Sequence, residues 1–149
     1  MDDPLYLGNV ESQRDWSHVG DMVDAVWRLL NQDVLRDDFN GNQDVVDYVV
    51  ASGTTRSVKE FVTHAFEAVG IIGKWEEGDD PIHEKFVACD RPLVRISPEF
   101  YRPADVELLL GDSSRIRSEL GWEPKRSFMA LVREMVQVDG ERYDGGKKS

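Results

Sequence analysis

Apolar residues recur with helical spacing in three stretches of the chain. In each stretch they follow an i, i+3, i+4, i+7 pattern, which places them on one broad face of a helix. This pattern predicts amphipathic helices over residues 19–30, 58–69 and 128–136. A shorter helix is expected over residues 113–120, with only Ile116 and Leu120 facing inward.

Residues at the ends of these stretches fit helix termini. Ser57 and Glu60 have the spacing of a capping box, and Gly70 stands where the second helix should end. Ser127 is placed to cap the third helix, and Gly121 to end the short one. The helix boundaries are therefore among the best-defined features of the sequence.

Short apolar runs bounded by Ser, Gly or Pro predict strands between the helices. They cover residues 48–51, 93–96 and 108–110, and residues 71–75 can add another. Strands alternating with helices indicate an α/β fold, here a small mixed sheet with three to four helices. No internal repeat or linker divides residues 1–139, whereas residues 140–149 form a polar tail that we expect to be disordered.

Composition narrows the classes of function. The 149 residues carry a formal net charge of −11, so binding to nucleic-acid phosphates is not expected. The single cysteine, Cys89, excludes an intrachain disulfide and a cysteine-based zinc site. The sequence has no signal-peptide pattern and no apolar run of membrane-spanning length, so a cytoplasmic location without membrane contact is expected.

Two arginines are candidates for binding an anion. Arg14 immediately precedes the first helix, where a guanidinium group and free backbone N–H groups can converge. Arg102 lies three residues before Asp105, so arginine could hold a phosphate while the carboxylate accepts hydrogen bonds from ribose. In both places an ordinary surface ion pair is an equally good interpretation, with Asp15 or Asp21 as partners for Arg14.

Other potentially reactive residues have weaker support. Tyr143 and Lys147 match a Tyr-x-x-x-Lys spacing, but two glycines lie between them in a polar tail. Trp16 and His18 are expected to be packing residues rather than ligands. His64 and His83 lack the spacing of metal ligands, and no metal site is expected.

Taken in order, several motifs resemble the C-terminal half of the GDP-mannose 4,6-dehydratases, which are extended short-chain dehydrogenases/reductases. The resemblance covers residues 5–139. It rests on Leu-Gly-Asn at 7–9, Arg-Asp-Trp-Ser-His at 14–18, Tyr-Val-Val-Ala-Ser-Gly at 48–53, Tyr-Arg-Pro-Ala-Asp-Val at 101–106 and Leu-Gly-Trp-Glu-Pro at 120–124.

The resemblance implies an NADP-dependent lyase activity. Enzymes of this family remove hydride from C4 of GDP-mannose, eliminate water across C5–C6 and return hydride to C6, giving GDP-4-dehydro-6-deoxy-D-mannose for GDP-fucose synthesis. By position, Arg14 and Arg102 would contact the diphosphate and Asp105 the ribose, with Gly8 and Asn9 in a loop beside the nucleotide. The family usually has glutamate where Asp105 stands.

The resemblance also implies that the NADP-binding Rossmann domain and the family's catalytic Ser/Thr, Glu, Tyr and Lys residues lie upstream of this sequence. The sequence contains no Gly-x-Gly-x-x-Gly turn. We therefore expect a substrate-binding portion that is inactive alone and exposes apolar surface, with a Rossmann-domain partner or self-association. The alternatives are a non-catalytic nucleotide-sugar-binding module, a subunit of a split enzyme, or the product of an incomplete gene.

Overall fold

The computed structural model describes residues 3–31, 47–102 and 108–146, with side chains as far as Tyr143. The predicted loop over residues 31–42 falls almost entirely outside these ranges. The elements in chain order are β1 (Leu5–Leu7), β2 (Gln13–Asp15), α1 (Val19–Leu30), β3 (Thr55–Ser57), α2 (Val58–Ala68), β4 (Lys74–Glu76), the 3-10 turn η1 (Pro81–His83), β5 (Lys85–Ala88), β6 (Arg91–Ile96), β7 (Leu108–Leu109), α3 (Ser114–Leu120) and α4 (Phe128–Gly146).

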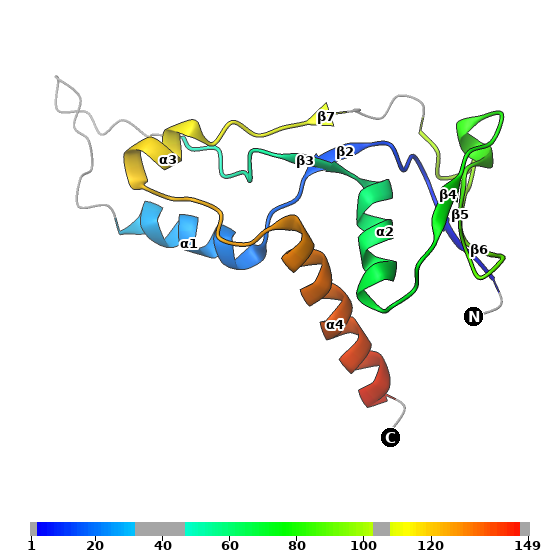
Figure 1. Ribbon diagram of the computed structural model, residues 1–149. Coiled ribbons are helices and arrows are strands. Elements are labelled where there is room, and N and C mark those ends of the chain that lie inside the picture. Colours follow the sequence, from blue (N-terminus) through cyan, green and yellow to red (C-terminus); the bar gives the residue numbers. More distant parts are fainter. Residues whose placement is uncertain (1–2, 32–46, 103–107, 147–149) are drawn as a thin grey trace.

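The strands form two small mixed sheets, which confirms the predicted α/β class. The first sheet has the order β1-β6-β5-β4, and only its β1–β6 pair is parallel. The second has the order β3-β2-β7, with β2 antiparallel to β3 and parallel to β7. Helix α2 lies between the first sheet and α4, and α4 extends away from the rest of the molecule (Figure 1).

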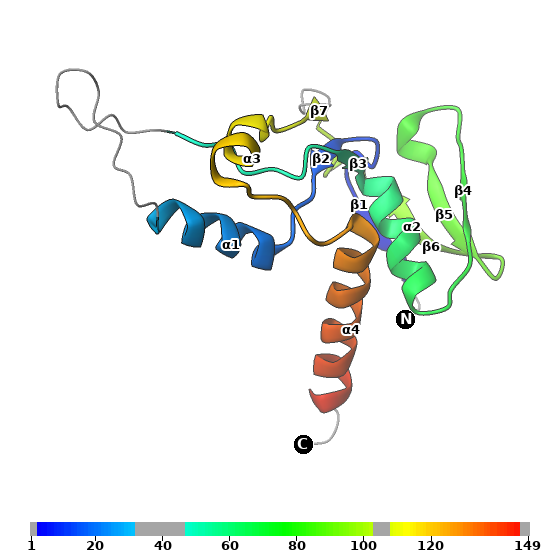
Figure 2. The same cartoon turned by 60° about the vertical axis from the view of Figure 1, so that its left-hand side comes forward.

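Two separate cores stabilise these layers. Val62 of α2 packs with Phe86, Ala88 and Val94 of the first sheet. At the other end of the molecule Ala25, Ile116 and Trp122 form the second core, where α1 and α3 lie close together (Figure 2). Each core joins elements that are distant in the sequence, as burial of apolar area requires.

Helix α1 turns its large apolar residues to solvent. Its buried residues are Asp21 and Ala25, while most of the predicted apolar face is exposed. The exposed members are Val19, Val23, Val26, Trp27 and Leu30. The sequence pattern predicted the helix correctly, but that face meets no core among the described residues.

The strand predictions were right in part. Segments 93–96 and 108–109 are strands, whereas 48–51, predicted as a strand, has no strand assignment. That segment pairs with neither sheet, and a strand needs a partner to satisfy its backbone groups. Strands β1, β2, β3 and β5 were not anticipated, because three or four residues are too few for a clear alternating pattern.

The C-terminal helix is longer than predicted. Residues 140–146 belong to α4, although they were expected to form part of a polar tail. Ser127 accepts a hydrogen bond from the Ala130 amide at the start of this helix, as predicted. Within the described stretches, every helix is too short or too polar to cross a bilayer.

Candidate nucleotide-binding site

Two segments leave the first sheet side by side. One, the first connection, joins β1 to β2, and the other, the second connection, begins after β6 and is described as far as residue 102. Strand β1 is parallel to β6, and β2 is parallel to β7. The Ser97 amide donates to the Leu7 carbonyl at 2.8 Å, which extends the pairing beyond the strands. A Cβ atom at Gly8 would lie 2.4 Å from the Phe100 carbonyl oxygen, so only glycine permits this approach. The topology therefore brings Gly8 beside the segment that leads to Arg102.

The start of α2 holds the first connection in place. The Lys59 amide donates to the Val10 carbonyl at 2.8 Å and the Val58 amide to the Ser12 carbonyl at 3.2 Å. Within the connection, the Asn9 side-chain oxygen accepts from the Glu11 amide at 3.0 Å. This local turn fixes the backbone around Asn9.

A charged cluster supports the same connection. The Lys59 ammonium donates to Glu11 at 2.9 Å and also to the buried Glu84. Burial alone would lower the pKa of Lys59, but hydrogen bonds and opposite charge from Glu84 and Glu11 raise it above its ordinary value. Lys59 therefore stays charged and links the connection to the end of η1.

Arg14 lies on β2, the central strand of the second sheet. Its Cα is in register with Arg56 of β3 on one side and with Leu109 of β7 on the other. The half-buried Arg14 donates from Nη1 to the Gln13 carbonyl at 2.8 Å. Of the two carboxylates suggested as its partner, Asp21 accepts from the Lys125 and Arg126 amides, both at 3.1 Å, and Asp15 accepts from the Ser52 and Gly53 amides.

A groove of about 520 Å³ lies next to Arg14. Met22 of α1 and the apolar residues of segments 49–51 and 109–110 form most of its walls. Gly111 is required at one end, because a Cβ atom there would lie 2.3 Å from the Ala51 Cβ. The groove thus combines one cationic side chain with apolar walls, as small-molecule sites commonly do.

Asp15 fixes the turn that follows segment 49–51 of the groove. Its Oδ1 accepts from the Ser52 amide at 2.8 Å, and its Oδ2 accepts from the Gly53 amide at 2.9 Å. On the other side of this turn, the Arg117 guanidinium donates to the Ser52 carbonyl at 2.8 Å. Burial raises the pKa of Asp15, but the hydrogen bonds from Ser52, Gly53 and Ser17 outweigh it and hold the pKa below its ordinary value.

The residues on either side of Ser17 pack as the sequence predicted. Trp16 stacks on Phe61 with ring centroids 4.8 Å apart, and its indole N–H donates to the Arg56 carbonyl. His18 is buried at the start of α1, where Nδ1 accepts from the Gly20 amide at 2.9 Å. Nε2 of the same ring lies 3.2 Å from Glu134 of α4.

The remaining predicted site residues lie at the edge of the described chain. Arg102 is exposed at the end of the second connection, and Asp105 falls outside the described residues. Three residues that shape the site were missed: Asp15, Lys59 and Arg56. Arg56 could have been noticed in the sequence only by its position, because it directly precedes Ser57, the first residue of the predicted capping box.

The starts of α1 and α2, which follow β2 and β3, do not offer a cradle for a dinucleotide phosphate. In α1 the Gly20 amide is bound by His18. In α2 the Val58 and Lys59 amides are bound by backbone carbonyls, and the Glu60 amide is bound by Ser57. These two helix starts therefore do not provide the cradle of amides that a dinucleotide pyrophosphate needs. Among the residues that the structure describes, no group of His, Cys, Asp and Glu is arranged to hold a metal ion.

Comparison with known structures indicates the same architecture. RMD from Pseudomonas aeruginosa, solved in complex with NADPH, gives a TM-score of 0.68 at 18% identity, covering 95% of this chain and 37% of that one. UDP-glucose 4-epimerase from Bifidobacterium longum, solved with NAD+ and UDP, gives 0.66 at 18% identity, covering 96% of this chain and 36% of the other. At this level of identity the likeness shows the fold.

Sequence relatives identify the family. Residues 1–135 match the family described as GDP-mannose 4,6 dehydratase. A GDP-mannose 4,6 dehydratase from Dictyostelium discoideum is 39% identical over 150 residues, 99% of this chain and 38% of its own length. GDP-mannose 4,6 dehydratase 2 from Caenorhabditis elegans is 42% identical over 136 residues, 91% of this chain and 32% of its own length. The chain spans about a third of the length of these relatives, and it belongs to the GDP-mannose 4,6-dehydratase family.

Proposed function

We propose that this chain is the nucleotide-sugar-binding portion of a GDP-mannose 4,6-dehydratase. In the complete enzyme it would bind GDP-mannose while the sugar is converted to GDP-4-dehydro-6-deoxy-D-mannose. The family match over residues 1–135 carries the proposal. The paired connections support it, because they bring Gly8 and the approach to Arg102 together beside the sheet that carries Arg14.

The groove beside Arg14 has the chemistry for a nucleotide diphosphate. Arginine binds phosphate through paired N–H donors. At 4 Å and an effective dielectric constant of 20, each opposite-charge contact is worth about 4 kcal/mol before desolvation. This local attraction can outweigh the net charge of −11, which acts from a greater distance and is screened by salt. We assign Arg14 and Arg102 to the diphosphate, Asp105 to ribose, and Gly8 and Asn9 to the nucleotide-side loop.

In this proposal NADP is bound by another part of a complete dehydratase. The cofactor supplies hydride transfer when bound, and the starts of α1 and α2 offer no cradle for its pyrophosphate. This chain would bind and orient the nucleotide sugar, and its own residues supply no step of hydride transfer. Its cytoplasmic location is also part of the proposal.

The exposed face of α1 supports a role for a partner that completes the enzyme. Trp27, Val23 and their neighbours form an apolar surface of the kind that marks interaction sites. The adjacent segment 48–51 is rich in strand-forming residues and pairs with neither described sheet. We propose that these two features meet the Rossmann portion of a dehydratase, and that self-association covers the same face when this portion is not present.

Calorimetric titration with GDP and GDP-mannose tests the binding proposal. We expect heat from the wild-type chain and at least a 10-fold weaker dissociation constant for Arg14→Gln. Arg95→Gln is the matched control, since Arg95 is an exposed strand arginine of the other sheet. A folded wild-type chain that binds neither ligand, or equal losses in the two variants, would contradict the proposal.

Co-expression tests the partner. The second chain carries the part of the Dictyostelium relative that this chain does not match, about two thirds of its length. We expect the two chains to co-purify and to form the 4-keto sugar from GDP-mannose and NADP, whereas neither chain does so alone. Trp27→Lys should abolish co-purification while leaving GDP binding intact. GDP binding without co-purification would favour a non-catalytic nucleotide-sugar module.

A further inference from the structure

Two arginines lie directly opposite each other on neighbouring strands of the second sheet. The antiparallel register pairs Arg14 of β2 with Arg56 of β3. Residues paired in this way project from the same face, with Cβ atoms about 4.5–5.5 Å apart. Like charges in this position destabilise a sheet. The pairing is notable in a chain with only 18 Lys and Arg against 29 Asp and Glu.

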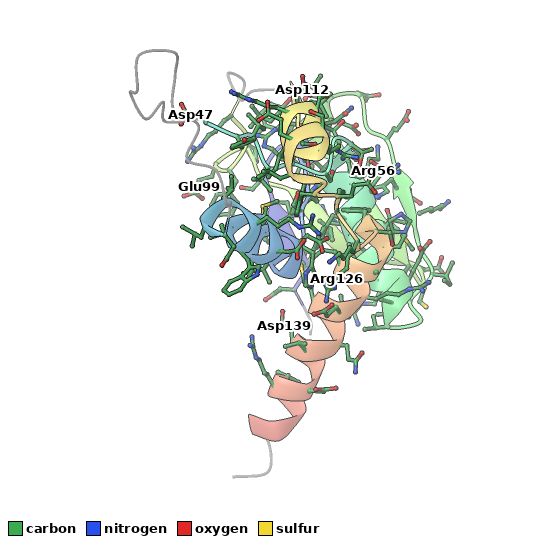
Figure 3. The ribbon with its side chains drawn as sticks, turned by 90° about the vertical axis from the view of Figure 1, so that its left-hand side faces the viewer. Asp47, Arg56, Glu99, Asp112, Arg126 and Asp139 are labelled. Carbon is green, nitrogen blue, oxygen red and sulfur yellow. The ribbon has the colours of Figure 1, made fainter. Side chains whose placement is uncertain are left out.

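A carboxylate is paired with Arg56. The Arg56 guanidinium donates from Nη1 to Glu60 Oε1 at 3.1 Å. Arg56 lies near the start of α2 (Figure 3). The Arg56 and Glu60 side chains are 49% and 41% exposed, and an ion pair with this exposure contributes little stability. An incoming phosphate can therefore replace Glu60 as the partner of Arg56 at low cost.

Glu60 does not depend on Arg56 for its own position. Its second oxygen accepts from the Ser57 amide at 2.8 Å, and the Ser57 hydroxyl accepts in return from the Glu60 amide. This capping box holds the carboxylate at the helix start whether or not Arg56 is bound. Arg56 can therefore change partners without loss of the helix cap.

We propose that Arg14 and Arg56 together bind the diphosphate of a nucleoside diphosphate sugar, and that Glu60 is the counter-ion that the ligand displaces. The inference rests on the proposed function and adds a contact that the family resemblance does not assign. Neighbouring guanidinium groups can each bind oxygens of adjacent phosphates through paired N–H donors. The three-stranded sheet holds both backbones in fixed register for this purpose.

Two substitutions should change GDP affinity in opposite directions. Arg56→Gln should weaken GDP binding by 10-fold or more and leave the binding of guanosine, which has no phosphate, unchanged. Glu60→Gln should strengthen GDP binding several-fold at low salt, because glutamine keeps the capping box and removes the competing charge. Arg95→Gln, on the other sheet, should change neither.

Inorganic pyrophosphate separates this inference from the proposed function. The wild-type chain should bind it, and Arg14→Gln or Arg56→Gln should each weaken that binding, whether or not the chain selects GDP. Equal pyrophosphate affinity in Arg56→Gln and Arg95→Gln overturns the Arg14–Arg56 site, even if GDP binding still depends on Arg14. If Arg56→Gln does not fold, Arg56→Lys keeps the charge without the paired donors, and unchanged affinity in that folded variant overturns the inference.

Discussion

Helices α1 and α2 have the same apolar spacing but opposite surroundings. In α2, Val62 is 8% exposed and packs into the core of the first sheet. In α1, Val23 occupies the matching position in the pattern and is 62% exposed, while Asp21 is 2% exposed. Helix α2 therefore presents its apolar face to a core, whereas α1 presents a similar face to solvent.

The difference shows what an amphipathic pattern specifies. The pattern determines which side of a helix is stabilised by burial away from water. It does not determine which molecule covers that side. The buried side of α1 is held by small and polar contacts: Ala25 fits against Trp122, and the Asp21 carboxylate accepts two backbone amides. We infer that α1 is positioned by its buried side, and that its outer face, which none of the described residues covers, is available to a partner.

Two tryptophans give the largest expected contrast around α1. Trp122 is fully buried and donates from its indole N–H to the Asp21 carbonyl at 2.9 Å, whereas Trp27 is 66% exposed. Trp122→Ala should lower the free energy of unfolding by about 3–5 kcal/mol, because it leaves a cavity. Trp27→Ala should change it by less than about 0.5 kcal/mol. Urea denaturation followed by circular dichroism measures both.

Trp27→Ala also tests whether a second molecule covers the outer face of α1. Sedimentation at several concentrations should show weaker self-association for Trp27→Ala than for the wild-type chain. A large loss of stability in monomeric Trp27→Ala would mean that the outward face of α1 is already part of a core within this chain.

A smaller contrast comes from matched valines on the two helices. Val62→Ala should cost about 2 kcal/mol, since it removes two buried methyl groups and leaves space in the first core. Val23→Ala should be close to neutral for unfolding, because its side chain is already in water. Thermal and urea unfolding of the two variants can be compared directly, and equal losses would remove the distinction between the helices.

The helix caps should differ by less. Ser57 caps α2 with a reciprocal bond from Glu60, while His18 caps α1 with one ring nitrogen and reaches Glu134 with the other. Ser57→Ala should cost about 1 kcal/mol. His18→Asn and His18→Ala both lose the contact of Nε2 with Glu134, but asparagine supplies a capping oxygen in place of Nδ1, so His18→Asn should cost less than His18→Ala. If the two His18 variants were equally destabilised, the cap would not be the source of the effect.

The sequence allowed the helices to be predicted better than the sheets. Helices carry local signals, such as the capping box at Ser57 and Glu60 and the end signal at Gly121, and both are present. Strand pairing depends on distant partners, so the three residues of β2 gave no signal of their own. Segment 48–51 shows the converse case, in which strand propensity is present and a strand partner is not.

The candidate site was predictable only as separate residues. The sequence singled out Gly8, Asn9 and Arg14, and the structure explains the contact between Gly8 and Phe100 through parallel β1 and β6. The sequence could not indicate that Arg56 lies opposite Arg14, because their pairing arises from the register of the two short strands β2 and β3. The assignments of Arg102 and Asp105 to a ligand stay predictions.

The smallest expected change in stability depends on pH and comes from the Asp15 carboxylate. Asp15 stands just before α1, and its carboxylate binds the turn at Ser52 and Gly53. Its pKa is held below the ordinary 3.8, so its ionised form stabilises the fold above the unfolded-state value, and this stabilisation is lost as pH falls through the lowered pKa. Asp15→Asn should cost about 0.5 kcal/mol at pH 7, since one neutral amide oxygen replaces two charged acceptors.

That difference should shrink as the pH falls below 3.8, because protonated Asp15 resembles asparagine. Urea unfolding of both proteins at pH 7, 5 and 3.5 measures the change. Val23→Ala is a suitable control, since Val23 lies on α1, is exposed and carries no ionisable group. A wild-type advantage that persists unchanged at pH 3.5 would show that Asp15 acts through shape alone. Narrowing of the difference for Asp15→Asn but not for Val23→Ala would show that an ionised carboxylate holds the turn beside the groove.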